Sequence, residues 1–500
     1  MDISQPDLEL FKKKYDNGQK QILYATFASD VHTPISSLLK LQKEKYIFLF
    51  ESVEKGSQKG RYSVIGLKPD LIWECKHNKC SVNDLNKKRV EKSDSKISPL
   101  KSLRNFFKIH KIIMPQNLPS ISSGFFGYLG YEMIKHFENI NLSKKDSLDL
   151  PESIFIRPSI TLVFDSVSDK LIITKIVSPT ANNSKTAFNR AKTEIYEILK
   201  RLNQPLNKSE LKIQTFKKKI DVFKNVKSNT NYNEFKRMVK KAKEYIYEGE
   251  IFQVVLSRIF KKRIDVMPIS IYRSLRYLNP SPYLFFMNFK DFVIIGSSPE
   301  ILIKLQNDRV TIRPIAGTRK RGKNKNEDKK LELELLSDPK EISEHLMLLD
   351  LGRNDISRVS IPGTVNVTDK MYIEYFSHVM HIVSNIEAKL KKDNDSTDVL
   401  FSGFPAGTVT GAPKIRAIQV IEELEKSKRN MYAGSVGFIS NNGDINTCIA
   451  LRSAFIKKNH IYVQAGAGIV ADSIPKNEFK ETESKALALL TACAYAKNFN

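Results

Sequence analysis

The spacing of hydrophobic and polar positions divides the chain into strand-rich and mixed parts. Short apolar or alternating runs predict strands at residues 46–50, 60–66, 159–165 and 170–176. Residues 123–132 combine three glycines with four aromatic residues, which allows a close approach of backbone to backbone. Residues 177–229 are mostly polar and contain one predicted helix. Beyond residue 231, predicted helices and strands alternate. We therefore predict an N-terminal domain over residues 1–180, a linker over 181–228 and a second domain over 229–500.

One predicted helix carries its own start signals. Asp338 can cap it, Pro339 suits its first position, and Glu341 lies where a capping box places a carboxylate. At about 100° per residue, three apolar side chains share one face. That face is expected to contact the core through Ile342, Leu346 and Leu349.

Two predicted helix starts each carry a pair of glutamates three residues apart. Glu341 and Glu344 form the first pair, and Glu478 and Glu481 form the second. Carboxylate oxygens presented together are the ligands that a hard cation such as Mg²⁺ prefers. The alternative is that all four are solvated first-turn glutamates, which the helix dipole favours.

Two glycine-containing segments are candidate anion sites. Residues 463–471 match a dinucleotide fingerprint on paper, but no helix opens at the glycines, so we expect a glycine-lined turn with or without an anion. Residues 407–414 lack the Walker A spacing and lead into a helix from Pro413 to about Lys426. Thr408 and the loop amides could bind a carboxylate at that helix start.

Two polar residues interrupt predicted apolar strands. Arg452 lies in the run 447–454, either as half of a buried ion pair or as a ligand group. His381 lies mid-strand, where a satisfied core histidine is the alternative to a functional one. The sequence contains no His-Glu-x-x-His zinc motif, no di-iron Glu-x-x-His pairing at Glu341 or Glu344, and no sign of a glutaminase nucleophile.

Composition narrows the class of protein. The net charge of +26 is spread along the chain without a nucleic-acid module, so we expect a Lys-rich surface and no nucleic-acid partner. No signal peptide and no apolar run of about 20 residues is visible, so we expect no membrane association. The sequence has four scattered cysteines, Cys75, Cys80, Cys448 and Cys493. Because they lack the spacing of a zinc site or a disulfide framework, we expect the protein to be in the reducing cytoplasm.

Several multi-residue motifs occur in one order along the chain: Ser298–Glu300, Pro314–Thr318, Lys340–Leu348, Arg353–Asp355, Gly407–Lys414, Gln464–Gly468 and Glu478–Ala486. In this order they resemble the chorismate-utilising enzymes, most closely the members that make anthranilate. The resemblance is strong over residues 231–493. It extends more thinly to residues 49–52, 60–63 and 124–131.

The resemblance implies an α+β fold of two mixed α/β domains with large, mostly antiparallel sheets flanked by helices. It also implies Mg²⁺ held by Glu344 and Glu481, with Glu341 and Glu478 beside them and Glu341 counted among the catalytic residues. Glu300 becomes the general acid for the departing 4-hydroxyl, and His381 assists the loss of pyruvate. The implied substrate pocket comprises Gly317, Thr318, Thr408, Tyr432, Arg452, Gly466, Ala467 and Gly468.

The implied reaction converts chorismate and ammonia to anthranilate and pyruvate in tryptophan biosynthesis. Since no amidotransferase domain is visible, a separate glutamine amidotransferase subunit would supply ammonia in a heterotetramer. Relatives that add water carry Lys where Gln253 stands. Relatives that make 4-amino-4-deoxychorismate typically carry a nucleophilic Lys where Ala316 stands, which disfavours that alternative.

The resemblance further implies feedback inhibition by tryptophan at a site in both halves of the chain. The residues are Ser52, Pro282, Tyr283 and Leu284. The alternative is a β-turn and a surface loop. A third hypothesis, a basic binding protein that has lost catalysis, is disfavoured by the two intact glutamate pairs.

Overall fold

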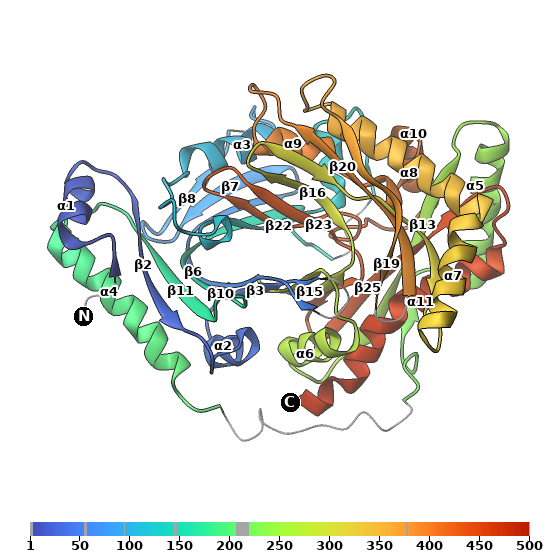
Figure 1. Cartoon of the computed structure of the whole chain (residues 1–500). Helices are drawn as coiled ribbons and strands as arrows, with labels where there is room; N and C mark the ends of the chain where they lie inside the picture. Colours follow the sequence, from blue (N-terminus) through green and yellow to red (C-terminus); the bar gives the residue numbers. More distant parts are fainter. Residues whose placement is uncertain are drawn as a thin grey trace.

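A computed structural model describes residues 4–54, 58–94, 96–144, 148–206, 220–376 and 379–499. Antiparallel strands dominate both parts of the chain (Figure 1). In the first part the strands are β1 Ser4–Gln5, β2 Gln21–Ala28, β3 Phe48–Glu51, β4 Val53–Glu54, β5 Gln58–Lys59, β6 Tyr62–Lys76, β7 Lys79–Asp84, β8 Arg89–Lys92, β9 Gly124–Leu129, β10 Ser153–Asp165 and β11 Lys170–Val177.

The strands of the second part are β12 Lys227–Ser228, β13 Gln253–Arg263, β14 Tyr283–Asn288, β15 Val293–Ser298, β16 Ile301–Gln306, β17 Arg309–Ile312, β18 Ile315–Lys320, β19 Asn366–Tyr375, β20 Val379–Lys389, β21 Gly411–Ala412, β22 Ser435–Ser440, β23 Ile445–Ile449, β24 Ser453–Lys457 and β25 His460–Ile469. The α-helices are α1 Leu8–Asp16, α2 Pro34–Leu41, α3 Pro99–Ile109, α4 Ser184–Leu202, α5 Tyr232–Tyr247, α6 Pro268–Leu278, α7 Lys325–Ser337, α8 Pro339–Ser357, α9 Ser396–Ser402, α10 Lys414–Leu424 and α11 Pro475–Tyr495.

Strands from the two parts of the chain pair directly with one another. β3 pairs with β14, and β9 pairs with β22, both antiparallel. Two buried apolar clusters contain side chains from both parts of the chain. One includes Trp73 and Val254, and the other includes Leu23 and Ile461. The two parts therefore share sheet and core, while the boundaries at residues 180 and 229 stay a prediction.

Helices cover the sheets on two sides. α5, α7, α8, α10 and α11 lie along one side in Figure 1, and α1 and α4 lie on the opposite side. α4 falls in the predicted linker, and its apolar face packs against β2 and β11. Linker residues 207–219 lie outside the described residues. Of the helices in the described ranges, none combines the length and low charge that a bilayer crossing requires.

Most predicted elements are present near their expected bounds. The two alternating runs in the first part form the β10–β11 hairpin, and the helix expected after Asn231 is α5, which begins after that residue's capping box. The expected fold class, α+β with large, mostly antiparallel sheets, is confirmed.

The orientation predicted for α8 is wrong in part. Leu349 is buried, but Leu346 is 39% exposed. The buried face instead contains His345, whose Nε2 lies 2.7 Å from Ser384 Oγ on β20. This polar contact with the sheet keeps the imidazole buried. The face of α8 that contacts the core is therefore different from the face predicted from its apolar residues alone.

Candidate active site

The first glutamate pair projects from the start of α8. The Asp338 carboxylate accepts hydrogen bonds from the Lys340 and Glu341 backbone N–H groups, which fixes the first turn. Glu341 Oε1 accepts a hydrogen bond from Arg319 at 2.9 Å. Glu344 Oε1 accepts one from Gln253 Nε2 at 3.3 Å, on the neighbouring strand β13.

The second pair projects from the start of α11. Glu481 Oε1 lies 2.7 Å from the ammonium of Lys485, one helical turn later. The same ammonium donates a hydrogen bond to the Gly466 carbonyl at 3.1 Å. α11 packs along β25, which brings this helix start to the sheet that also carries Gln253.

The two pairs influence each other electrostatically. Burial raises the pKa of Glu344, and Glu341 and Glu481 raise it further, while Gln253 and Lys485 act in the opposite direction. Burial and Glu481 likewise raise the pKa of Glu478. Carboxylates from two separated segments therefore lie near enough to influence each other's protonation, and a bound cation would offset their mutual repulsion.

The donor set at the glutamates fits a hard divalent cation. Every candidate ligand atom is a carboxylate oxygen, which is the donor type Mg²⁺ selects. In the described residues the four carboxylates are spaced too widely to form a group with all ligand oxygens within 4.8 Å. The Lys485 ammonium instead supplies the positive charge beside Glu481.

Glu300 is a buried acid between β15 and β16. Its backbone carbonyl accepts a hydrogen bond from Ile449 N–H at 3.0 Å, and its side chain is buried. Burial raises the pKa of Glu300 to about 8, although Thr408 and Arg452 each act to lower it. At neutral pH the group is consequently a protonated acid.

Arg452 does not lie inside a strand, as expected from the apolar run, but in the break between β23 and β24. Its backbone φ is 45°, in the left-handed region. Burial lowers its pKa, and Glu300 partly offsets this effect. Its guanidinium forms no ion pair with any described residue, so the expected alternative of a structural ion pair is not observed.

Gly317, Thr318 and His381 lie together where β18 pairs with β20. His381 Nδ1 is 2.9 Å from the Gly317 carbonyl oxygen and 3.0 Å from Thr318 Oγ1. Burial lowers the pKa of His381 to about 4, so the ring is neutral at pH 7. Since the carbonyl can only accept, Nδ1–H donates to it, and Nε2 keeps its lone pair.

Gly317 also links this group to the first glutamate pair. Its φ is 71°, and a Cβ built there would lie 3.2 Å from Glu341 Oε2. A side chain at this position would therefore strain the backbone and crowd the carboxylate.

Gly466, Ala467 and Gly468 do not form the expected turn; they lie within β25 and pair with β13. A Cβ at Gly466 would lie 2.8 Å from the Tyr432 hydroxyl oxygen, and one at Gly468 would lie 2.7 Å from Gln253 Nε2. The glycines thus make room for two polar side chains beside the strand. Burial raises the pKa of Tyr432 to about 12, which keeps its hydroxyl a hydrogen-bond donor.

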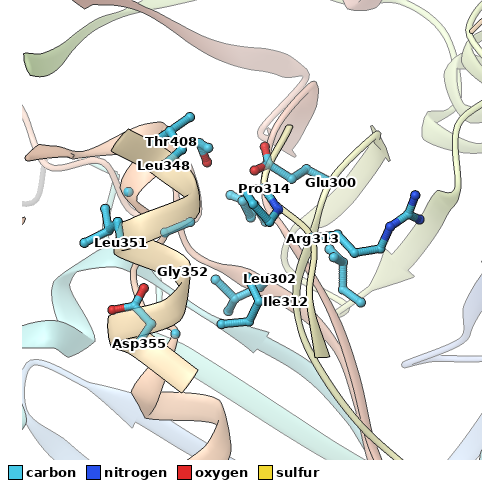
Figure 2. Close-up of a pocket in the computed structure, with 15 residues that line it drawn as sticks. Glu300, Leu302, Ile312, Arg313, Pro314, Leu348, Leu351, Gly352, Asp355 and Thr408 are labelled. Atoms are coloured by element: carbon cyan, nitrogen blue, oxygen red, sulfur yellow. The ribbon is translucent and has the colours of Figure 1, made fainter. Parts of the chain in front are cut away.

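Figure 2 shows Glu300 and Thr408 on a small cavity beside α8. Its volume of about 30 Å³ suffices for one or two water molecules and not for a substituted ring. Although the Thr408 hydroxyl lies near enough to lower the Glu300 pKa, it meets no partner within hydrogen-bond geometry in the described chain.

Three further polar residues contact the predicted site: Gln253, Arg319 and Lys485. From the sequence, Gln253 is only a marker of reaction type. Lys485 could have been found from its position four residues after Glu481, where the two side chains share a helix face. Arg319 had no such signal, because its contact with Glu341 spans two elements.

The four residues expected at the inhibitor site line a second, larger cavity. It has a volume of about 1130 Å³, and its walls include Ser52, Pro282, Tyr283 and Leu284. Ser52 follows β3, and the other three lie at the start of β14, so the β3–β14 pairing brings them together. Pro282 and Tyr283 therefore lie on a cavity wall and not on a plain surface loop.

A protonated buried acid, an unpaired guanidinium, a neutral imidazole and two pairs of carboxylates are groups of the kind that enzymes use on small anionic substrates. A model of the family described as chorismate binding enzyme matches residues 48–491. The chain belongs to this family.

Relatives and solved structures agree with that assignment. The chain is 43% identical over 493 residues to anthranilate synthase component 1 from Cereibacter sphaeroides, with 98% of each chain covered. It is 42% identical to the protein of that name from Aquifex aeolicus, again with 98% of each covered.

A crystal structure of anthranilate synthase component I from Streptococcus pneumoniae superposes with a TM-score of 0.75 at 36% identity. The match covers 86% of this chain and 92% of that one. The menaquinone-specific isochorismate synthase from Escherichia coli shares the fold, with a TM-score of 0.70 at 20% identity, covering 97% of this chain and 98% of that one.

Proposed function

We propose that this chain is the synthase subunit of an anthranilate synthase, which converts chorismate and ammonia to anthranilate and pyruvate in tryptophan biosynthesis. The observation that carries the proposal is the unpaired Arg452 guanidinium beside the protonated Glu300. An anionic substrate with a poor leaving group requires both a positive partner and a proton donor. High identity to component 1 proteins over almost the full chain supports the same conclusion.

Glu344 and Glu481 are the proposed ligands of Mg²⁺, with Glu341 and Glu478 beside them. When bound, the ion supplies positive charge that polarises the ring carboxylate of chorismate. Arg319 and Gln253 donate hydrogen bonds to Glu341 and Glu344 and so orient their carboxylates.

The remaining steps belong to the side chains. Arg452 pairs with a carboxylate of the dianionic substrate, and Glu300 donates its proton to the 4-hydroxyl, which leaves as water while ammonia adds at the 2-position. The ammonium group formed by this addition loses a proton, which restores the protonated Glu300. The neutral His381 then accepts the proton of ring carbon 2 at Nε2 while the bond from the ring to the enolpyruvyl oxygen breaks. The ring becomes aromatic, and the departing enolpyruvate takes up a proton and leaves as pyruvate.

Two positions favour anthranilate over the related products. Gln253 faces Glu344 and cannot act as a base toward water, whereas ammonia is already a nucleophile. Ala316 is buried in β18 and offers no amine, so a covalent route to 4-amino-4-deoxychorismate has no nucleophile at this position.

Ammonia would come from a glutamine amidotransferase subunit in a heterotetramer, in the cytoplasm. The component 1 names of the relatives support a partner subunit. We also propose that tryptophan inhibits the enzyme by binding the 1130 Å³ cavity, since the four residues expected for that role line it.

The test is anthranilate fluorescence from chorismate, ammonium salt and Mg²⁺ with the purified chain. We expect turnover that Glu344→Gln and Glu481→Gln each lower by about 10²-fold or more, because each removes a charged ligand. Glu9→Gln, at an exposed position of α1, is the matched control and should not change the rate. A folded protein that makes no product, or makes 4-amino-4-deoxychorismate, would refute the proposal.

A further inference from the structure

A cluster of soft and nitrogen donors lies apart from the glutamates, at the end of the β6–β7 hairpin. Cys75 and Cys80 are directly opposite one another across this hairpin. His136 ends a short 3-10 helix over Tyr131–His136, and Glu152 immediately precedes β10. Four donor side chains thus come from separated segments of the chain.

Three of these donors are close enough to share one ion. One ligand atom each from Cys75, His136 and Glu152 lies within 4.8 Å of the other two, and Cys80 is not a member of this group. It is the only such group among the described residues. Cys75 Sγ is 3.6 Å from Glu152 Oε2, and the Cys75 thiol also interacts with that of Cys80. Both thiols and the carboxylate are buried.

The imidazole of His136 is the unsatisfied member of the cluster. Its Nε2 is buried and finds no hydrogen-bond partner in the described chain. Buried polar nitrogens are rarely left in this state without a function or a bound group. A metal ion at the centre of the cluster would give this atom its partner.

Polar contacts fix the carboxylate of the cluster. Lys135 Nζ lies 2.8 Å from Glu152 Oε1, and Lys428 Nζ lies 4.0 Å from the same atom. The Asn78 backbone N–H donates to Oε2 at 3.0 Å. One thiolate and one carboxylate balance the two positive charges of a divalent ion, while these contacts orient the carboxylate.

We propose that Cys75, His136 and Glu152 bind a soft divalent metal of the zinc class, with the fourth tetrahedral position left to a water molecule. Thiolate and imidazole donors select Zn²⁺, whereas Mg²⁺ requires oxygen ligands. The bound ion would join the β6–β7 hairpin, the 3-10 helix and the start of β10. Binding would release the Cys75 thiol proton to solvent. The sequence did not reveal this site, because its three ligands are distant from one another along the chain.

The test uses the full chain, stripped of metal with a chelator, then titrated with Zn²⁺ in excess Mg²⁺. We expect one Zn²⁺ per chain and, at about 100 times Kd, a thermal midpoint about 2–3 °C higher. Co²⁺ in place of Zn²⁺ should give thiolate-to-metal charge-transfer absorption with tetrahedral ligand-field bands.

Ligand variants separate this site from others. Cys75→Ser and His136→Gln should each weaken Zn²⁺ binding by at least about 10-fold and alter the Co²⁺ spectrum. Cys448→Ser, Cys493→Ser and Glu344→Gln should bind as the parent does. If a ligand variant fails to fold by circular dichroism, the parent's Co²⁺ spectrum decides alone.

Three results would overturn the inference. They are the absence of stoichiometric Zn²⁺ binding, a Co²⁺ spectrum without thiolate absorption, and binding that Cys75→Ser and His136→Gln leave unchanged. None of them bears on chorismate turnover, so the failure of this site and of the proposed function are distinguishable.

Discussion

At the scale of single residues, burial sets protonation in opposite directions for an acid and a base. It raises the pKa of Glu300 to about 8 and lowers that of His381 to about 4. Both groups are therefore uncharged at pH 7, one as a proton donor and the other as a proton acceptor. Neither protonation state can be predicted from the residues next to Glu300 or His381 in sequence, because the elements that bury these side chains are distant along the chain.

The first prediction is an alkaline limit on turnover. Glu300 must be protonated to act as an acid, so kcat should fall as pH rises through about 8. Measured kcat–pH profiles should show this limb in the parent. Glu300→Gln should lack it and turn over about 10²–10⁴-fold more slowly. A limb that persists in Glu300→Gln would assign it to another group.

The second prediction concerns the unpaired guanidinium. Arg452→Gln should raise KM for chorismate about 10²-fold, the expected loss for one partner of a buried charge pair. Because Arg452 lowers the pKa of Glu300, the alkaline limb should also move to higher pH. Steady-state kinetics across pH measure both. An unchanged KM would show that the substrate does not contact this residue.

At the scale of elements, features that depend on neighbouring residues could be predicted from the sequence, whereas features that depend on strand pairing could not. The start of α8 was predictable because a cap and a first-turn proline act within four residues. The strand containing Gly466 to Gly468 was not, since its partner β13 lies about 200 residues earlier. The interruption between β23 and β24 at Arg452 could not be predicted for the same reason. It lies where the two strands pair with different partners, β23 with β16 and β24 with β15.

The third prediction tests the cap of α8. Asp338→Ala removes the acceptor for the first-turn N–H groups, at a cost of about 1 kcal/mol, and loosens the turn that holds Glu341. We expect about fivefold weaker apparent Mg²⁺ activation, measured by titration of turnover.

Asp338→Asn is the matched control for this cap. It keeps a capping oxygen but loses the charge that pairs with Arg319 at 2.7 Å. If Asn behaves like Ala, the ion pair and not the cap positions the glutamates.

At the scale of the whole molecule, the two parts of the chain are built into one sheet. The polar stretch between them suggested two domains, yet β3–β14 and β9–β22 cross that division. Which strands pair cannot be inferred from composition, so the sequence could predict the fold class but not the strand pairing between the two parts of the chain. The same pairing assembles a cavity whose walls neither part could form alone.

The fourth prediction uses that cavity. Ser52→Phe should fill part of it and raise the inhibition constant for tryptophan by about tenfold or more, because the phenyl ring takes up space that the ligand would occupy. Without tryptophan, kcat and KM should match the parent, because Ser52 does not contact the glutamates or Glu300. Equal inhibition constants in mutant and parent would place the inhibitor elsewhere.

The β14–β15 hairpin has a mechanical consequence. Tyr283, on the cavity wall, is the register partner of Ser298, two residues before Glu300. β15 pairs on its other side with β24, and the Ser297 N–H donates to the carbonyl of Arg452. The cavity wall is therefore connected to Glu300 and Arg452 through adjacent strands of one sheet. A ligand in the cavity that displaced β14 would act on both residues through these backbone hydrogen bonds, without movement of a separate domain.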